Sequence, residues 1–227
     1  GYGGLVVGGE GHGIAKWLNA QGIAGIVLEY RLPAGHDKVP LLDAQKALTL
    51  TRTRAAAWKI DPKKVGIIGF SAGGHLAATA ATHFTPENRP DFAILIYPVI
   101  TMSVGTHGGS KKNLLGPTPT EELANLYSNE KQVTKETPPT FLWHTDEDTV
   151  VPPQNSVVFY MACCENDVPA ELHVFPHGKH GVGLAPDDPA LSAWPQVNVF
   201  VEIKQESIDR FGSRFTVARV LEALQPC

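Results

Sequence analysis

Short apolar runs alternate with amphipathic segments along most of the chain. Runs rich in β-branched and aromatic residues predict strands over residues 23–30, 65–70, 92–97, 140–144 and 170–175. The intervening segments predict helices over residues 40–58, 74–81 and 153–166. Alternation of this kind is typical of an α/β fold, with a mostly parallel sheet that carries helices on both faces.

The segment between two of the predicted strands, residues 99–137, is unusually long and contains several glycines. It either carries substrate-contacting structure at the carboxyl end of the sheet or is a surface excursion, and the pattern leaves both open. No repeat, low-complexity tract or linker is visible, so we expect one domain over residues 1–227. Residues 195–227 form an atypical tail: 197–202 has strand character and 217–224 predicts a short helix, but no function follows from them.

The stretch Gly69-Phe70-Ser71-Ala72-Gly73 joins a predicted strand to a predicted helix and places Ser71 at the tip of the turn. This context is typical of a nucleophilic serine held at strained backbone angles. We expect glycine at positions 69 and 73 because a Cβ at either would collide with the adjoining strand or helix. The turn also places Ser71 at a helix N-terminus, where N–H groups can stabilise negative charge.

The same turn has two other interpretations, a glycine-rich turn that only packs and a phosphate-binding loop. A phosphate loop requires G-x-x-x-x-G-K-[ST] and a dinucleotide loop requires G-x-G-x-x-G. Neither pattern occurs at this turn. The sequence therefore favours a nucleophile.

A serine nucleophile needs a histidine base, and the histidine needs an acid that fixes its tautomer. Acids follow the predicted strand 140–144 at Asp146, Glu147 and Asp148, and histidines follow the strand 170–175 at His177 and His180. We favour Asp148, because Val150-Val151-Pro152 should hold its loop in place. We favour His180, because the following glycine gives its loop the flexibility to reach Ser71. The others are interpreted as turn or structural residues.

An oxyanion hole requires two N–H donors. The backbone of Ala72, directly after the nucleophile, is expected to supply one. The second donor is expected from the glycine-rich start of the chain, at Gly1 and Tyr2. The alternative for that segment is a flexible terminal stub.

Composition excludes several other classes of function. The chain has 19 basic and 23 acidic residues, a net charge of −4, and no basic run, so no nucleic-acid partner is expected. No apolar run reaches the length of a membrane span, and the absence of a signal-peptide pattern favours a cytoplasmic location. The three cysteines do not form a disulfide framework. No histidine spacing resembles a zinc site, so we expect no metal or other cofactor, and His75 and His144 are interpreted as structural.

Together these stretches resemble the α/β-hydrolase superfamily, and within it the esterase and lipase group that includes acetylxylan-esterase-like carbohydrate esterases. The resemblance covers residues 1–194 and is carried by residues 1–4, 28–33, 60–62, 69–77, 97–98, 138–152 and 173–181. It implies that Ser71, Asp148 and His180 are the catalytic residues and that Gly1 and Tyr2 belong to the oxyanion loop. The family has strands before that loop and this sequence has none there, so we expect either a shortened sheet or an incomplete sequence.

The predicted function is that of a serine esterase acting on short-chain carboxylic esters, with acetyl groups on xylan or sugars as the substrates that the resemblance implies. A broad short-chain carboxylesterase is the alternative of the same class. A peptidase of the prolyl-oligopeptidase type shares the catalytic residues but normally carries a propeller, of which this sequence shows no sign. A non-catalytic binding protein with a relic site is the alternative of another class. The expected partner is a small-molecule or carbohydrate ester.

Overall fold

The computed structural model describes residues 1–192 and residue 194. Contacts divide the chain into two compact units. The first consists of residues 1–5 and 30–181, and the second of residues 6–29 with the described residues from 182 onwards. The expectation of one domain over residues 1–227 stays a prediction. The predicted elements of the tail, at 197–202 and 217–224, lie outside the described residues.

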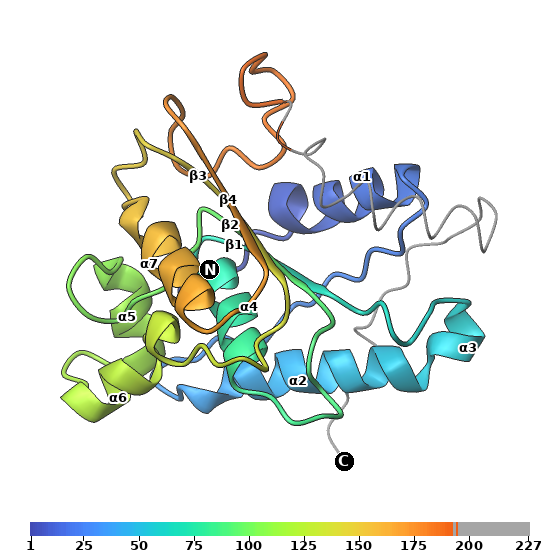
Figure 1. The fold of residues 1–227 in the computed structure, drawn as a ribbon, viewed down its shortest axis with the longest axis horizontal. Coiled ribbons are helices and arrows are strands. Elements are labelled where there is room, and N and C mark those ends of the chain that lie inside the picture. The colour runs from blue at the N-terminus through green and yellow to red at the C-terminus, as the bar shows by residue number, and fades with distance from the viewer. Residues whose placement is uncertain (193, 195–227) are drawn as a thin grey trace. The chain divides into compact units, whose positions relative to one another are not determined.

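The first unit is built on a parallel sheet of four strands in the order β1-β2-β3-β4 (Figure 1). The strands are β1 (Ile67–Phe70), β2 (Ala93–Ile96), β3 (Thr140–Thr145) and β4 (Ala170–Phe175). Gly69, Leu95, Leu142 and Leu172 lie side by side across it. Because every pairing is parallel, the loops that follow all four strands emerge at one edge. The predicted α/β-hydrolase fold is confirmed, with a parallel sheet flanked by helices.

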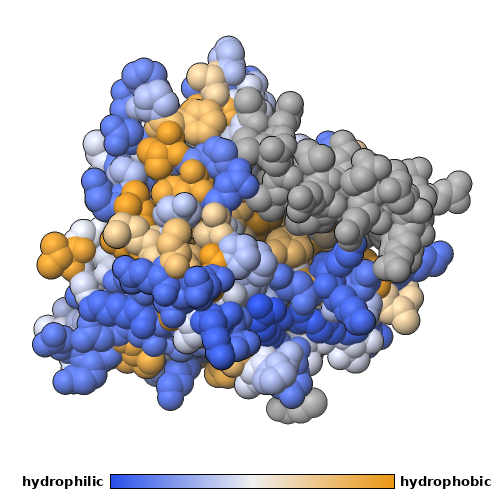
Figure 2. Space-filling view, viewed as in Figure 1, coloured by the Kyte–Doolittle hydropathy of each residue, from blue (hydrophilic) through white to orange (hydrophobic). Residues whose placement is uncertain are grey.

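Helices α4 (Ala72–Thr82) and α7 (Gln154–Glu165) pack on one face of this sheet. Small side chains of α4, among them Ala78 at 0% exposure, allow close approach to the strands, while Phe159 of α7 fills the same core. The predicted helix over 40–58 is two helices, α2 (Lys38–Thr53) and α3 (Ala55–Trp58), because the backbone leaves the helical region at Arg54. Val158 and Met161 of α7 are exposed. Figure 2 shows hydrophobic surface on the side of the view where α7 lies in Figure 1.

The insertion at 99–137 forms α5 (Gly108–Leu115), α6 (Glu121–Leu126) and a short 3₁₀ helix, η2 (Asn129–Lys131). Its two ends are tied together, since the Asn129 amide donates to the carbonyl of Ile100 at 3.2 Å. The Met102 amide donates to Ser128 Oγ at 2.9 Å. The insertion is therefore a folded part of the first unit.

The second unit contains the π-helical turn η1 (Gly8–Gly13) and helix α1 (Ile14–Ala20). The predicted strand over 23–30 is wrong, because these residues form no strand in the structure. Gly25 instead lies against α1, where an added Cβ would come within 2.7 Å of Ala15 Cα. An apolar run indicates burial, but strand pairing also needs a neighbour that the run itself does not reveal. None of the helices that the structure describes is long and apolar enough to cross a lipid bilayer.

Candidate active site

Ser71 occupies the turn between β1 and α4 with a backbone φ of 54° and ψ of −122°, a conformation that non-glycine residues rarely adopt. Its amide donates to the Ile96 carbonyl at 3.0 Å. Its own carbonyl accepts from the amides of His75 at 3.1 Å and Val99 at 3.0 Å. Bonds to the end of β2, to the loop that follows it and to α4 therefore hold the strained serine in place.

The glycines around Ser71 do not all have the role that the sequence predicted. A Cβ at Gly69 would lie 2.1 Å from the Gly73 carbonyl oxygen, so glycine is required there as expected. The prediction for Gly73 is wrong, because an added Cβ would meet nothing within 4 Å. The second tight position is Gly74, where a Cβ would lie 2.7 Å from the side chain of Pro98. The crowding on the helix side comes from the loop after β2, which a local pattern does not reveal.

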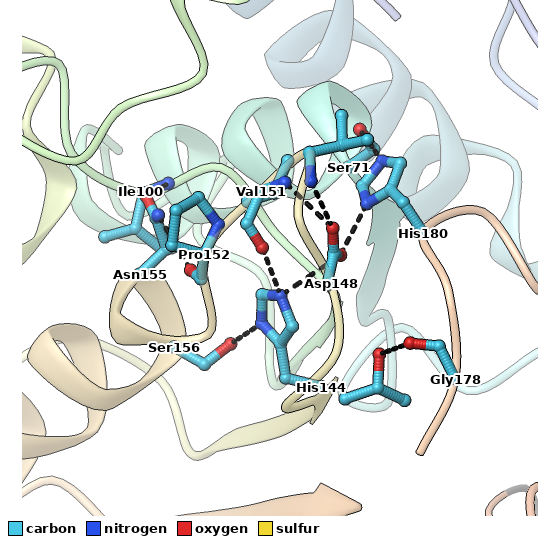
Figure 3. Close-up of polar contacts among 12 residues, drawn as sticks. Ser71, Ile100, His144, Asp148, Val151, Pro152, Asn155, Ser156, Gly178 and His180 are labelled. Atoms are coloured by element: carbon cyan, nitrogen blue, oxygen red, sulfur yellow. Dashed lines mark hydrogen bonds and ion pairs between the residues drawn. The ribbon is translucent and has the colours of Figure 1, made fainter. Parts of the chain in front are cut away.

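The structure brings Ser71, His180 and Asp148 into one hydrogen-bonded line (Figure 3). His180 Nε2 lies 2.8 Å from Ser71 Oγ, and His180 Nδ1 lies 2.6 Å from Asp148 Oδ2. An ionised carboxylate only accepts, so Nδ1 carries the hydrogen and Nε2 is left to accept from the serine hydroxyl. The ring of Tyr97, at the end of β2, packs edge-on against His180 with centroids 5.0 Å apart.

Asp148 is 3% exposed, yet its carboxylate is well supplied with donors. Oδ1 accepts from the amides of Val150 and Val151, both at 2.9 Å, so the following residues hold this loop as expected. Oδ2 faces His180 and also lies 3.4 Å from His144 Nε2. Burial by itself raises the pKa of Asp148, but these hydrogen bonds outweigh it and hold the pKa well below its usual range. The carboxylate is therefore ionised at neutral pH.

The competing acids and the competing histidine lie on the solvent side of the same loops. Glu147 accepts from His177 Nδ1 at 3.0 Å and from the Gly178 amide at 3.1 Å, and both side chains are exposed. Thr145 Oγ1 donates to the Gly178 carbonyl at 2.8 Å. These contacts join the loop after β3 to the loop after β4. Asp146 is exposed.

Helix α4 links the two predicted parts of the oxyanion hole. Ala72 is the first residue of α4 and is 3% exposed. Tyr2 is also 3% exposed, and its hydroxyl lies 2.7 Å from Nδ1 of His75, a residue of the same helix. This burial does not fit the alternative of a loose terminal stub. The oxyanion roles of Ala72, Gly1 and Tyr2 stay predictions.

His75 is fully buried, and its two ring nitrogens have different partners. Nε2 lies 2.8 Å from the Tyr127 carbonyl, which only accepts, so Nε2 carries the hydrogen. Nδ1 is therefore the acceptor for the Tyr2 hydroxyl. Burial lowers the pKa of His75 to about 4, which keeps the ring neutral in this arrangement.

The sequence interpretation missed the contribution of Asn155, which is 1% exposed on α7. Its Oδ1 accepts from the Ile100 amide at 2.9 Å, and its Nδ2 donates to the carbonyls of Gly105 at 3.1 Å and Pro152 at 3.0 Å (Figure 3). One amide thus ties the start of the insertion to the loop that carries Asp148. An asparagine in the first turn of an ordinary amphipathic helix gives no signal of such a role. Among the described residues, no three His, Cys, Asp or Glu side chains gather as a metal site requires.

Comparison with known families identifies the fold and the lineage. Residues 43–190 match the prolyl oligopeptidase family. This chain belongs to that family. The matched region contains Ser71, Asp148 and His180.

Relatives of this family member include proteins named for xylan chemistry. Endo-1,4-beta-xylanase B of Butyrivibrio fibrisolvens is 40% identical over 200 residues, which are 82% of this chain and 31% of that protein. Acetylxylan esterase of Xylanibacter ruminicola is 38% identical over 180 residues, which are 77% of this chain and 38% of that protein. The chain thus spans about a third of the length of these two curated relatives.

Solved structures of related proteins share the fold of this chain over most of its length. The acetyl ester-xyloside bifunctional hydrolase from Caldicellulosiruptor lactoaceticus is 41% identical, with a TM-score of 0.76 over 88% of this chain and 76% of that one. The carboxylesterase Cest-2923 from Lactobacillus plantarum is 27% identical, with a TM-score of 0.76 over 91% of this chain and 83% of that one. The resemblance to esterases of the α/β-hydrolase superfamily is confirmed.

Proposed function

We propose that this chain is a serine esterase that hydrolyses acetyl esters. The observation that carries the proposal is the unbroken line from Ser71 Oγ through His180 to the buried carboxylate of Asp148. Each contact is within 2.8 Å, and the serine stands at a strained turn directly before a helix. Burial and hydrogen bonds hold these groups in the alignment that base-assisted attack requires.

In the proposed reaction Ser71 Oγ attacks the ester carbonyl carbon while its proton passes to His180 Nε2. The tetrahedral intermediate then collapses, its bond to the alkoxy oxygen breaks, and His180 returns the proton to the leaving alcohol. Water attacks the acyl-enzyme in the same way and releases the carboxylic acid and Ser71. Asp148 stays ionised throughout and stabilises the imidazolium that forms in each half of the cycle.

The oxyanion of each tetrahedral intermediate is assigned to the N-terminus of α4 and the glycine-rich start of the chain. The backbone of Ala72 supplies one N–H, and Gly1 and Tyr2 supply the other. The contact between Tyr2 and His75 supports this assignment, because it fastens the glycine-rich segment to the helix that begins at Ala72.

Acetyl groups on xylan or on sugars are the proposed natural substrate. The names of an acetylxylan esterase and of an acetyl ester-xyloside hydrolase among the relatives support this choice. The carboxylesterase among the structural neighbours supports the broader alternative, a generalist for short acyl chains. The insertion at 99–137 is the proposed source of substrate contacts, because Asn155 ties it to the loop that carries Asp148.

Rates across a series of p-nitrophenyl esters, measured beside release of acetate from acetylated xylan, test the proposal. A serine esterase loses essentially all turnover in Ser71→Ala and all labelling by a fluorophosphonate probe. A sharp preference for acetyl supports the carbohydrate substrate, and a flat profile to about eight carbons supports the generalist. Turnover that survives in Ser71→Ala contradicts the mechanism, and a wild type without labelling supports a non-catalytic binding protein.

A further inference from the structure

A second imidazole, that of His144, lies behind the carboxylate of Asp148. His144 belongs to β3, and its side chain is fully buried. Nδ1 lies 2.8 Å from Ser156 Oγ on α7, and Nε2 lies 2.9 Å from the carbonyl oxygen of Val151. The same Nε2 is 3.4 Å from Asp148 Oδ2, the oxygen that also faces His180 (Figure 3).

These contacts decide which nitrogen of His144 carries the hydrogen. The Val151 carbonyl can only accept, so the hydrogen is on Nε2, and Nδ1 accepts from the Ser156 hydroxyl. The N–H of Nε2 is therefore directed at the Val151 carbonyl with the Asp148 carboxylate beside it. In a site from which water is excluded, such a fixed dipole acts on a nearby charge far more strongly than it does in solvent.

We propose that His144 is a positioning residue for the esterase reaction, which keeps the Asp148 carboxylate aligned with His180 and moderates its negative charge. This inference rests on the proposed function, in which Asp148 acts through His180. The ring joins three segments, namely the end of β3, the loop at Val151 and the first turn of α7 at Ser156. Because His144 Nε2 lies 3.4 Å from Asp148 Oδ2, and Oδ2 contacts His180, we expect a change at His144 to reach Ser71 through Asp148 and His180.

The effect on the base has a definite sign. The His144 N–H offsets part of the carboxylate charge, so its loss makes Asp148 hold the proton on His180 more strongly. The acidic limb of the pH profile of kcat/KM then moves to higher pH, because His180 loses its proton only at a higher pH. His107, the N-cap residue of α5, also interacts with this pair. Burial lowers the pKa of His107, His180 lowers it further and Asp148 raises it. Glu147 is paired with His177 on the solvent side.

Matched variants separate this role from simple packing. His144→Asn places its amide where Nδ1 lies and loses the donor toward Val151 and Asp148. His144→Gln places an amide nitrogen where Nε2 lies and keeps that donor. Ser156→Ala removes the partner of Nδ1 and leaves the Nε2 hydrogen in place. Unfolding measured for each variant reports the loss of stability that packing alone would cause.

We expect the acidic limb to move up by about half a pH unit in His144→Asn, which lowers kcat/KM on that limb by at most about threefold. Loss of alignment of Asp148 should lower kcat/KM further at every pH. In His144→Gln the acidic limb should lie at the wild-type pH. In Ser156→Ala it should also stay at the wild-type pH, even if the free energy of unfolding falls. The proposal is overturned if His144→Asn loses activity and stability with the limb unmoved, or if Ser156→Ala moves the limb equally.

A measurement that needs no turnover separates this inference from the proposed function. The downfield proton resonance between His180 Nδ1 and Asp148, assigned by its loss in Asp148→Asn, should move further downfield in His144→Asn and stay unchanged in Ser156→Ala. An unchanged resonance in His144→Asn contradicts the positioning role whether or not the wild type hydrolyses esters. A shifted resonance in a protein without esterase activity contradicts the proposed function alone.

Discussion

The two sides of the candidate site are built around buried histidines in different ways. We call the carboxylate Asp148 with His144 the acid side, and residues 1–2 with His75 the oxyanion side. His144 lies four residues before its acid, whereas His75 lies 73 residues after the tyrosine that it holds. The acid side surrounds an ionised group, and the oxyanion side contains only neutral partners. Charge therefore controls one side and long-range packing controls the other.

The largest difference between the sides should appear when the charge is removed. Asp148→Asn keeps the shape of the side chain but leaves His180 without an anion and favours the wrong tautomer. We expect kcat/KM for p-nitrophenyl acetate to fall about 10⁴-fold near pH 7. Circular dichroism serves as the control for folding. A fall of less than tenfold in a folded variant would show that the acid side is dispensable.

A smaller loss is expected on the oxyanion side. Tyr2→Phe removes the hydroxyl that is 2.7 Å from His75 Nδ1 and leaves that buried nitrogen with only the more distant hydroxyl of Thr79, at 3.4 Å. We expect a decrease of about 1–2 kcal/mol in the free energy of unfolding. We also expect kcat to fall about tenfold with KM little changed, because the loop acts on the transition state. A variant with a raised KM and an unchanged kcat would instead place Tyr2 in substrate binding.

The neutral histidine of the oxyanion side makes a specific prediction for the pH dependence of stability. The pKa of His75 is about 4 in the folded chain and about 6.5 when unfolded, so the unfolded state binds more protons between these values. The contribution of His75 to the free energy of unfolding is therefore fully present well above pH 6.5, and it is lost as the pH falls toward 4.

Urea unfolding at pH 7 and pH 5 measures this loss. We expect His75 to contribute about 2 kcal/mol of destabilisation between the two conditions. His75→Gln lowers stability at both pH values but should lack that part of the decrease. The difference between the two proteins is the quantity compared, because the pKa values of His83 and His107 are also lowered. Equal decreases in the two proteins would show that His75 is not the titrating group.

The smallest effect is expected at the exposed contact of Glu147, next to the acid side. Glu147→Gln weakens the contacts to His177 and Gly178 that join the two catalytic loops. Exposed ion pairs contribute little and are screened by salt, so we expect kcat/KM to fall less than about threefold. The remaining difference should shrink further at high ionic strength. A loss of a hundredfold would mean that this contact, and not the buried network, aligns the loops.

The sequence was most informative where a local pattern carries the chemistry. The turn at Ser71 and the loops of Asp148 and His180 follow predicted strands, and in a parallel sheet such loops share one edge. Their meeting within hydrogen-bonding distance could therefore be expected from spacing and residue type alone.

The errors and omissions arose where a role depends on a distant neighbour. Gly73 is a glycine without a steric need in the structure, while Gly74 is confined by Pro98. Residues 23–30 have the composition of a strand, but they do not form one in the structure. His75 and His144 are buried and hydrogen-bonded, as the structural interpretation expected. Their partners, Tyr2, Ser156 and the Val151 carbonyl, could not be named from the sequence because they meet them only in the folded chain.

The strained backbone of Ser71 has a consequence for how this protein acquires its reactivity during folding. An unfolded chain does not hold a serine at φ 54°, and here that angle is maintained by bonds to the end of β2 and to α4. Parallel strands joined by a crossover helix pair late, because the loop between them must close first. The rate at which Ser71 becomes reactive toward a fluorophosphonate during refolding would thus report when β1, α4 and β2 have packed together.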